Sequence, residues 1–134
     1  MQYELPINDL KFLLFDVLGV DGVADLGKYA EVSPDIIVAV LEEMGRFAAD
    51  VIQPTNRNGD EQGCSYDAHS HAVTTPDGFR DAYRQFAAGG WTALDAPTDF
   101  GGQGLPHVLK FIVDEIICST NLSFGMYPGL THGA

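Results

Sequence analysis

Basic residues are scarce in this sequence of 134 residues. Seven Lys and Arg stand against 19 Asp and Glu, which gives a formal net charge of −12 at pH 7. Proteins that follow a phosphate backbone need clustered Lys and Arg to displace its counterions, and an anionic membrane surface attracts the same side chains. We therefore expect no nucleic-acid partner and no binding to a membrane surface.

Cysteines and long apolar runs are also scarce. Cys64 and Cys118 are the two cysteines, and their wide spacing argues against a disulfide framework or a thiolate metal site and is typical of a reducing compartment. The longest apolar candidate, 105–130, is interrupted by three charged residues, whereas a membrane-spanning helix needs about 18 or more apolar residues in a row. The first twenty residues have neither a signal-peptide cleavage site nor the arginines of a transit peptide. We expect a soluble, cytoplasmic chain without a membrane span.

Helical periodicity is abundant, and apolar residues make up 46% of the chain, as in one globular domain. Apolar residues recur at three- and four-residue steps over 8–18, Gly19 follows as a C-terminal stop, and a short amphipathic piece covers 24–29. The triplet Ser33-Pro34-Asp35 combines an N-cap, a first-turn proline and a first-turn acid. It predicts a helix that continues to about Pro54.

The second half of the chain repeats these signals after a predicted connecting loop over 55–75. Thr75-Pro76-Asp77 has the same capping pattern and predicts a helix that Gly89-Gly90 ends. The last long helix is expected over about 106–120 with its charged residues Lys110, Asp114 and Glu115 outward, and a second apolar stretch follows from Asn121. These elements predict an all-α fold, a helical bundle of about five or six helices.

Two loop segments contain residues that could bind ligands. His69 and His71, with Cys64 and Asp67 nearby, form a loose cluster that would bind zinc only if three ligands converged in one geometry. Solvated histidines in a polar loop are the favoured interpretation. The glycines of 101–104 could expose backbone N–H groups to a phosphate. Without a P-loop or dinucleotide-binding pattern around them, a tight turn is the favoured interpretation.

The remaining candidates for catalysis fit structural roles better. Ser119, Ser123 and His132 lack the G-x-S-x-G turn of a hydrolase nucleophile. The adjacent acids Glu42-Glu43 and Asp114-Glu115 point to different sides of a helix, so solvated helix faces are favoured over an acid–base pair. Three further apolar side chains are expected in the core rather than in a ligand site: Phe124, Met126 and Tyr127.

Several motifs resemble the N-terminal helical domain of the acyl-CoA dehydrogenases, in order and spacing as well as in residues. They are Gly89-Gly90-Trp91-Thr92, Asp99-Phe100-Gly101-Gly102-Gln103-Gly104-Leu105-Pro106, Asp114-Glu115, Asn121-Leu122-Ser123-Phe124 and the terminal Tyr127-Pro128-Gly129-Leu130-Thr131-His132-Gly133-Ala134. Asn56, Gly59-Asp60 and Gly63-Cys64 also fit a loop of this family. The opening residues Tyr3, Leu5-Pro6, Asp9-Leu10 and Phe12 look like the short helical extension of one of its subgroups. The resemblance implies an N-terminal helical extension over 1–32 and the family's N-terminal helical domain over 33–134.

This resemblance implies a role in a flavoprotein oxidoreductase of fatty-acid oxidation. In this family a carboxylate removes a proton beside the thioester of an acyl-CoA substrate, a hydride passes from the β-carbon to FAD, and electrons continue to an electron-transfer flavoprotein. The complete enzymes are homo-oligomers with a middle β-domain and a C-terminal helical domain, which contain the catalytic glutamate and most FAD and CoA contacts. The resemblance therefore implies no catalytic residue in this chain, no FAD held by it alone and no activity by itself.

The resemblance also implies that this chain supplies one wall of the acyl pocket. Carried over by position, the substrate-binding residues are Phe124, Gly125, Tyr127, Pro128, Gly129 and His132. Small glycines leave room for an alkyl chain beside aromatic side chains. Pro128 departs from many family members and should kink this helix, which would reshape the pocket.

The strong negative charge bears on the choice between functions. FAD and CoA both contain phosphates, so a chain of charge −12 leaves their cationic partners to residues outside it. The alternative to an enzyme part is a truncated, non-catalytic helical module that binds a protein partner through its apolar faces. Zinc binding through Cys64, His69 and His71 remains a third hypothesis.

Overall fold

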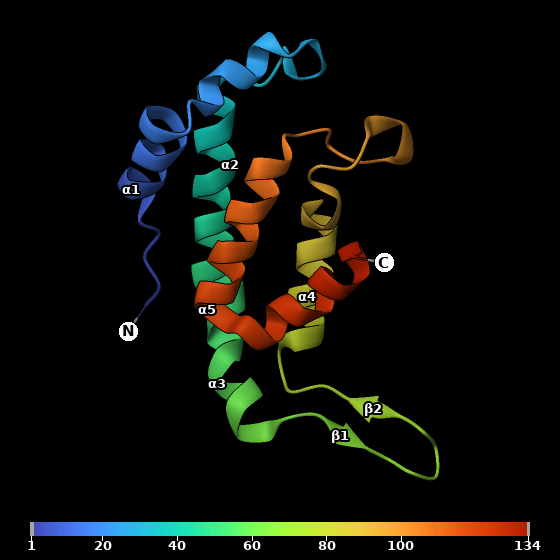
Figure 1. Cartoon of the computed structure of the whole chain (residues 1–134). Coiled ribbons are helices and arrows are strands. Elements are labelled where there is room, and N and C mark those ends of the chain that lie inside the picture. The colour runs from blue at the N-terminus through green and yellow to red at the C-terminus, as the bar shows by residue number, and fades with distance from the viewer. Residues whose placement is uncertain (1, 134) are drawn as a thin grey trace.

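A computed structural model describes residues 2–133 as a bundle of helices with one small hairpin. The bundle contains α2 (Pro34–Phe47), α3 (Gln53–Gln62), α4 (Phe79–Ala88) and α5 (His107–Gly133), while α1 (Ile7–Lys11) lies beside the upper part of α2 (Figure 1). The strands β1 (Ser65–Tyr66) and β2 (Val73–Thr74) pair antiparallel at the lower end. The all-α prediction is confirmed, because these two-residue strands are the whole sheet content of the described residues.

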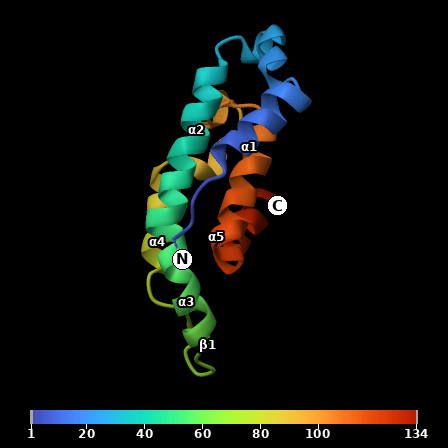
Figure 2. The ribbon, with the colours of Figure 1, turned by 90° about the vertical axis from the view of Figure 1, so that its left-hand side faces the viewer.

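Short helical turns complete the chain between these elements. A π-helical segment (Phe12–Val17) continues α1, and another (Ala48–Ile52) joins α2 to α3, so that α2 and α3 form one long rod (Figure 2). The 3₁₀ turns cover Val20–Asp25, Gly27–Tyr29, Trp91–Ala93 and Thr98–Phe100. No helix within residues 2–133 is long and apolar enough to cross a membrane.

The start of α2 and the end of the first helical segment follow the sequence signals. The Ser33 hydroxyl accepts a hydrogen bond from the Ile36 N–H (3.3 Å), and Pro34 occupies the first turn, where its missing N–H leaves no bond unmade. Gly19 has φ 61°, a left-handed conformation that stops the preceding helix and favours glycine. Both predictions are confirmed.

The core lies between the α2–α3 rod, α4 and the first part of α5. Leu41, Met44 and Ile52 on the rod are fully buried, as are Val113 and Leu109 on α5. Each large aliphatic side chain buried in this way stabilises the fold by roughly 1.5–3 kcal/mol. The aromatic members of the core come from all three sides of the bundle: Phe47, Phe79, Phe86, Trp91 and Phe124.

The N-terminal segment contacts the rod through one hydrogen bond and one close packing contact. The Tyr3 N–H donates to the Gln53 side chain (2.7 Å). Leu5 packs directly onto Gly45, where a Cβ atom would lie 2.8–2.9 Å from the leucine side chain. Gly45 is therefore the site at which the segment before α1 contacts the bundle.

The prediction of a connecting loop over 55–75 is wrong. Helix α3 runs to Gln62, and a hairpin follows it. Helical propensity is low in this stretch, and packing overrides it: Thr55 is buried, and Phe79 lies so close to Gly59 that a Cβ there would be 2.8 Å from the ring. Pro54 stands in the first turn of α3, directly after the π-helical segment, where the regular α-helical hydrogen-bond pattern is already interrupted.

The cap predicted at Thr75-Pro76-Asp77 is also wrong. Helix α4 begins at Phe79, three residues after the predicted start at Pro76; Gly78 with φ 87° precedes it, and no side chain caps it. Asp77 is bound elsewhere, because its N–H donates to Gln62 Oε1 (2.8 Å) and its carboxylate accepts from Gln62 Nε2 (3.2 Å). These bonds attach the start of α4 to the end of α3.

Helix α5 breaks at Asn121 and not at Pro128. Asn121 has extended backbone angles (φ −159°, ψ 95°), and it divides α5 into a first segment, 107–120, and a second segment, 122–133. Its buried side chain accepts a hydrogen bond from the Phe124 N–H (3.0 Å) and donates to Thr55 Oγ1 (2.9 Å). Asn121 therefore caps the second segment and bonds it to α3, so the apolar stretch predicted from this residue is a helical segment of its own.

Replacing this side chain should destabilise the protein. In Asn121→Ala the Phe124 N–H loses its cap and Thr55 loses its buried partner, so we expect the free energy of unfolding to fall by about 1–3 kcal/mol. Urea denaturation followed by circular dichroism measures the change. Ser119→Ala, an exposed position on the same helix, is the control. Equal stability of the two variants would contradict the role of Asn121.

Candidate functional site

The residues predicted to line an acyl pocket lie on the second segment of α5. Phe124 is fully buried, with its ring 5.9 Å from Phe86 and 6.3 Å from Phe79. Pro128 is buried too, and a Cβ at Gly125 would lie 3.3 Å from Ile117 and Cys118 on the first segment. These three residues hold the second segment against the bundle.

The other predicted pocket residues reach the surface. Tyr127 and His132 are partly exposed, and no atom of another element lies within 4 Å of a Cβ built at Gly129. The Tyr127 ring packs edge-on against Phe79 (5.8 Å), and its hydroxyl lies 3.6 Å from the Cys64 thiol. Burial, together with this contact, raises the pKa of Tyr127, so it stays a neutral phenol. The assignment of these six residues to an acyl pocket stays a prediction.

An open groove of about 780 Å³ lies between β2, α4 and Tyr127. Its lining includes the apolar side chains of Pro76 and Phe79, which are buried, and the exposed side chains of Arg80 and Arg84. Tyr127 is the predicted pocket residue that contacts this groove. The second segment also presents an apolar stripe, which we define as Leu122, Met126 and Leu130, each more than half exposed and four residues apart on one helix face.

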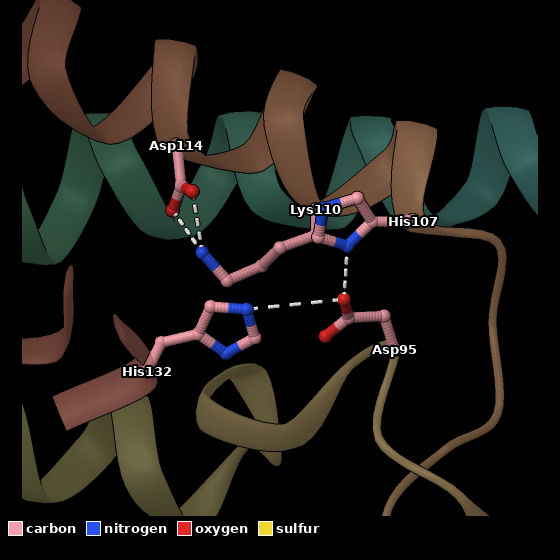
Figure 3. A network of polar contacts seen from close by, with 5 residues as sticks. All are labelled: Asp95, His107, Lys110, Asp114 and His132. Atoms are coloured by element: carbon pink, nitrogen blue, oxygen red, sulfur yellow. Dashed lines mark hydrogen bonds and ion pairs between the residues drawn. The ribbon is translucent and has the colours of Figure 1, made fainter. Parts of the chain in front are cut away.

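A polar cluster that the sequence analysis missed lies at the other end of the second segment (Figure 3). Asp95 follows the 3₁₀ turn at Trp91, His107 begins α5, and His132 lies near the end of α5. The His107 ring is hydrogen-bonded to the Asp95 carboxylate, and His132 Nε2 lies 3.9 Å from the same oxygen. No local spacing links three residues so far apart, so only the fold brings them together.

The Asp95 carboxyl is ionised in this setting. Burial alone would raise the pKa of Asp95, but the hydrogen bond with His107, the backbone N–H of Asp95 itself and the nearby His132 outweigh it and lower the pKa below its usual value. The side chain is 10% exposed, while those of His107 and His132 are 57% and 37% exposed. A buried carboxylate is thus covered by two accessible imidazoles.

Comparisons with known proteins agree on one family. Residues 37–134 match the family model described as acyl-CoA dehydrogenase, N-terminal domain. The chain belongs to the acyl-CoA dehydrogenase family. It is 37% identical over its whole length to the 3-methylmercaptopropionyl-CoA dehydrogenase of Ruegeria pomeroyi, covering 22% of that protein.

Two further acyl-CoA dehydrogenases resemble the chain more distantly. The broad-specificity linear acyl-CoA dehydrogenase FadE5 of Mycobacterium tuberculosis is 28% identical over 95% of the chain and 21% of that protein. The butyryl-CoA dehydrogenase of Syntrophomonas wolfei is 26% identical over 98% of the chain and 22% of that protein. The chain thus spans about a fifth of the length of these curated relatives.

The glycine loop of this acyl-CoA dehydrogenase chain is not a phosphate cradle. The N–H groups of Gly101, Gly102 and Gly104 donate to carbonyls of Thr98, Pro97 and Ala96 at 2.9–3.1 Å, and those of Gln103 and Leu105 donate to Ala93 and Leu94 at 3.0 Å. An anion would need these donors free. The loop is therefore a closed turn, as the favoured interpretation predicted, and it fixes the backbone just after Asp95.

Three side chains of the candidate zinc cluster, those of Cys64, Asp67 and His71, contact other protein groups. The His71 ring is hydrogen-bonded to the Tyr66 hydroxyl (2.7 Å), and Cys64 contacts Tyr127. The Asp67 carboxylate accepts from the N–H groups of His69 (2.7 Å) and Ser70 (3.1 Å), and these bonds lower the pKa of Asp67. The group of three potential ligands found among the described residues is Asp95, His107 and His132.

Lys110 was predicted to point outward, and this prediction is wrong. Its side chain is 5% exposed, and its ammonium donates to both oxygens of Asp114 one turn later (Figure 3). Such burial requires a paired charge, which Asp114 supplies. Burial, with a contribution from Asp114, also raises the pKa of the neighbouring Cys118 thiol.

The closed turn depends on Gly102, where a Cβ atom would collide with the carbonyl group of Ala96. We expect Gly102→Ala to displace the loop and reduce the free energy of unfolding by about 1–3 kcal/mol. Because Asp95 adjoins this loop, the NMR signals of the His107 and His132 rings should move as well. Asp99→Ala, exposed in the same loop, should change neither quantity. An unaltered stability and spectrum in Gly102→Ala would contradict this role.

Proposed function

We propose that this chain forms the N-terminal helical domain of an FAD-dependent acyl-CoA dehydrogenase and supplies one wall of the acyl pocket through the second segment of α5. The match to the family's N-terminal domain over 37–134 carries the proposal. The acyl-CoA dehydrogenase names of the three relatives support acyl-CoA as the substrate class. The complete enzyme would catalyse α,β-dehydrogenation of the acyl thioester.

The second segment is built as a wall rather than as a catalytic site. Phe124 anchors it in the core, Asn121 caps it, and Tyr127 and Gly129 remain on its surface. An alkyl chain needs an apolar surface with room for its methylene groups. The open space beside Gly129 meets this requirement, and Met126, three residues earlier on the same helix face, supplies exposed apolar surface next to it.

The apolar stripe supports contact with further domains. Leu122, Met126 and Leu130 are 64%, 57% and 71% exposed. Contiguous exposed apolar residues mark surfaces that other protein or ligand groups cover. In our proposal the domain that completes the acyl pocket covers this stripe.

The described residues do not fit FAD as a site of their own. A dinucleotide pyrophosphate needs uncompensated donors or cations. In the groove at α4, Arg80 and Arg84 stand beside Asp77 and Asp81, and Arg84 pairs with Asp81 at 3.6 Å. The N–H groups of the glycine loop are already bonded. We therefore assign FAD binding, transfer of electrons to an electron-transfer flavoprotein and homo-oligomer formation to the complete enzyme.

A chimaeric enzyme tests the proposed function. This chain would replace the 134 aligned residues of the Ruegeria pomeroyi relative, and acyl-CoA oxidation would be followed with an artificial electron acceptor over substrates of increasing chain length. We expect the chimaera to retain bound flavin and to oxidise at least one acyl-CoA. A folded, flavin-containing chimaera that is inactive on every substrate would contradict the enzyme role and favour a partner-binding module.

The same chimaera tests the wall through Gly129. We expect Gly129→Val to reduce kcat/KM for the longest accepted acyl chains relative to the shortest, because the new methyl groups fill space beside the alkyl chain. A difference of about one or two methylenes in a pocket corresponds to roughly 10–200-fold in kcat/KM. Ala39→Val, exposed on α2, is the matched control. A uniform loss over all chain lengths would contradict a role of Gly129 in the wall.

A further inference from the structure

Asp95, His107 and His132 form a polar cluster, and His132 is the one member that is also predicted to line the acyl pocket. Their potential ligand atoms, one from each residue, all lie within 4.8 Å of one another. They come from three separate places in the chain: the turn after Trp91, the first residue of α5 and the end of its second segment. In Figure 3 both imidazole rings turn a nitrogen toward the same carboxylate.

One oxygen of the Asp95 carboxylate lacks a hydrogen bond. Asp95 Oδ1 is buried and has no hydrogen-bond partner among the described residues. An unsatisfied buried acceptor is costly and requires an explanation, such as an ion. Figure 3 shows this second oxygen on the side of Asp95 that faces the His132 ring. One oxygen is therefore shared by two imidazoles, and the other is available.

We propose that Asp95, His107 and His132 bind a divalent transition-metal ion, with Zn²⁺ as the best match. Two imidazole nitrogens and one carboxylate oxygen form a donor set that zinc accepts, with a fourth position for water. The ligand atoms must lie about 2.0–2.2 Å from the metal. The side chains have freedom to reach this geometry, because both imidazoles are partly exposed.

The nearby lysine does not oppose a cation here. Lys110 lies beside the cluster in Figure 3, but its ammonium is bound by both oxygens of Asp114. Its charge is thus compensated within an ion pair on the same helix. The Asp95 carboxylate keeps its own negative charge for the metal.

A metal at this site would join the two ends of α5. His107 precedes the break at Asn121 and His132 follows it, so one ion would fix the end of the second segment to the start of the first. Asp95 adds the turn before the glycine loop. The ion would therefore stabilise the orientation of the second segment, independently of whether this segment lines an acyl pocket.

The test uses the metal alone and the 134-residue chain after removal of metals with a chelator. Isothermal titration calorimetry with Zn²⁺ should give one site with a dissociation constant in the micromolar range or below, and Co²⁺ should give the visible absorption of a four-coordinate site. Zn²⁺ should raise the melting temperature. Absence of Zn²⁺ binding at a 1:1 ratio would overturn the proposal.

Variants identify the ligands. Asp95→Asn, His107→Gln and His132→Gln should each weaken Zn²⁺ binding at least about tenfold, since changes even behind the ligands cost 10–100-fold. The double variant His69→Gln/His71→Gln removes the other two of the four histidines and should bind like the unaltered chain. His107→Gln decides the outcome if another variant fails to fold, because its ring is more than half exposed. Unchanged affinity in His107→Gln, or loss in the double variant, would overturn the assignment.

Discussion

The hydrogen bonds of one buried side-chain amide, that of Asn121, determine the direction of the second segment of α5. Asn121 interrupts α5, accepts from the Phe124 N–H in the first turn of the second segment, and donates to Thr55 on α3. A buried amide that makes these bonds specifies one arrangement, because any other leaves a donor or an acceptor without a partner. The direction of the second segment, and with it the position of Tyr127, Gly129 and His132, follows from this residue.

Close approach between elements is the second constraint. Gly59 admits the Phe79 ring, Gly125 brings the two segments of α5 together, and Gly102 allows the glycine loop to close. At each of these glycines, an atom of another residue lies close to the position that a Cβ atom would take. The fold therefore depends on small residues inside or beside helices, where glycine would otherwise be unfavourable.

Local signals in the sequence predicted the elements whose causes are local. Ser33 and Pro34 start α2, Gly19 stops the first helical segment, and the apolar stretch from Asn121 is a separate helical segment. The prediction failed where distant residues decide. Gln62 binds Asp77, which was expected in the first turn of the helix but lies before it. The burial of Thr55 retains α3 in a stretch of weak helix formers. Lys110 was predicted to face solvent because a Lys–Asp pair four residues apart can form on an exposed or on a buried helix face, and the sequence does not distinguish the two. The cluster of Asp95, His107 and His132 has no periodicity or motif, so only the three-dimensional fold reveals it.

The apolar stripe on the second segment has a consequence for the chain in solution. Two copies that met through Leu122, Met126 and Leu130 would each carry a net charge of −12 into the contact. Salt screens the electrostatic repulsion between the two copies, and the screening length falls to about 10 Å at 0.1 M salt. The acidic composition therefore opposes contact between separate molecules at low ionic strength, and added salt weakens this repulsion.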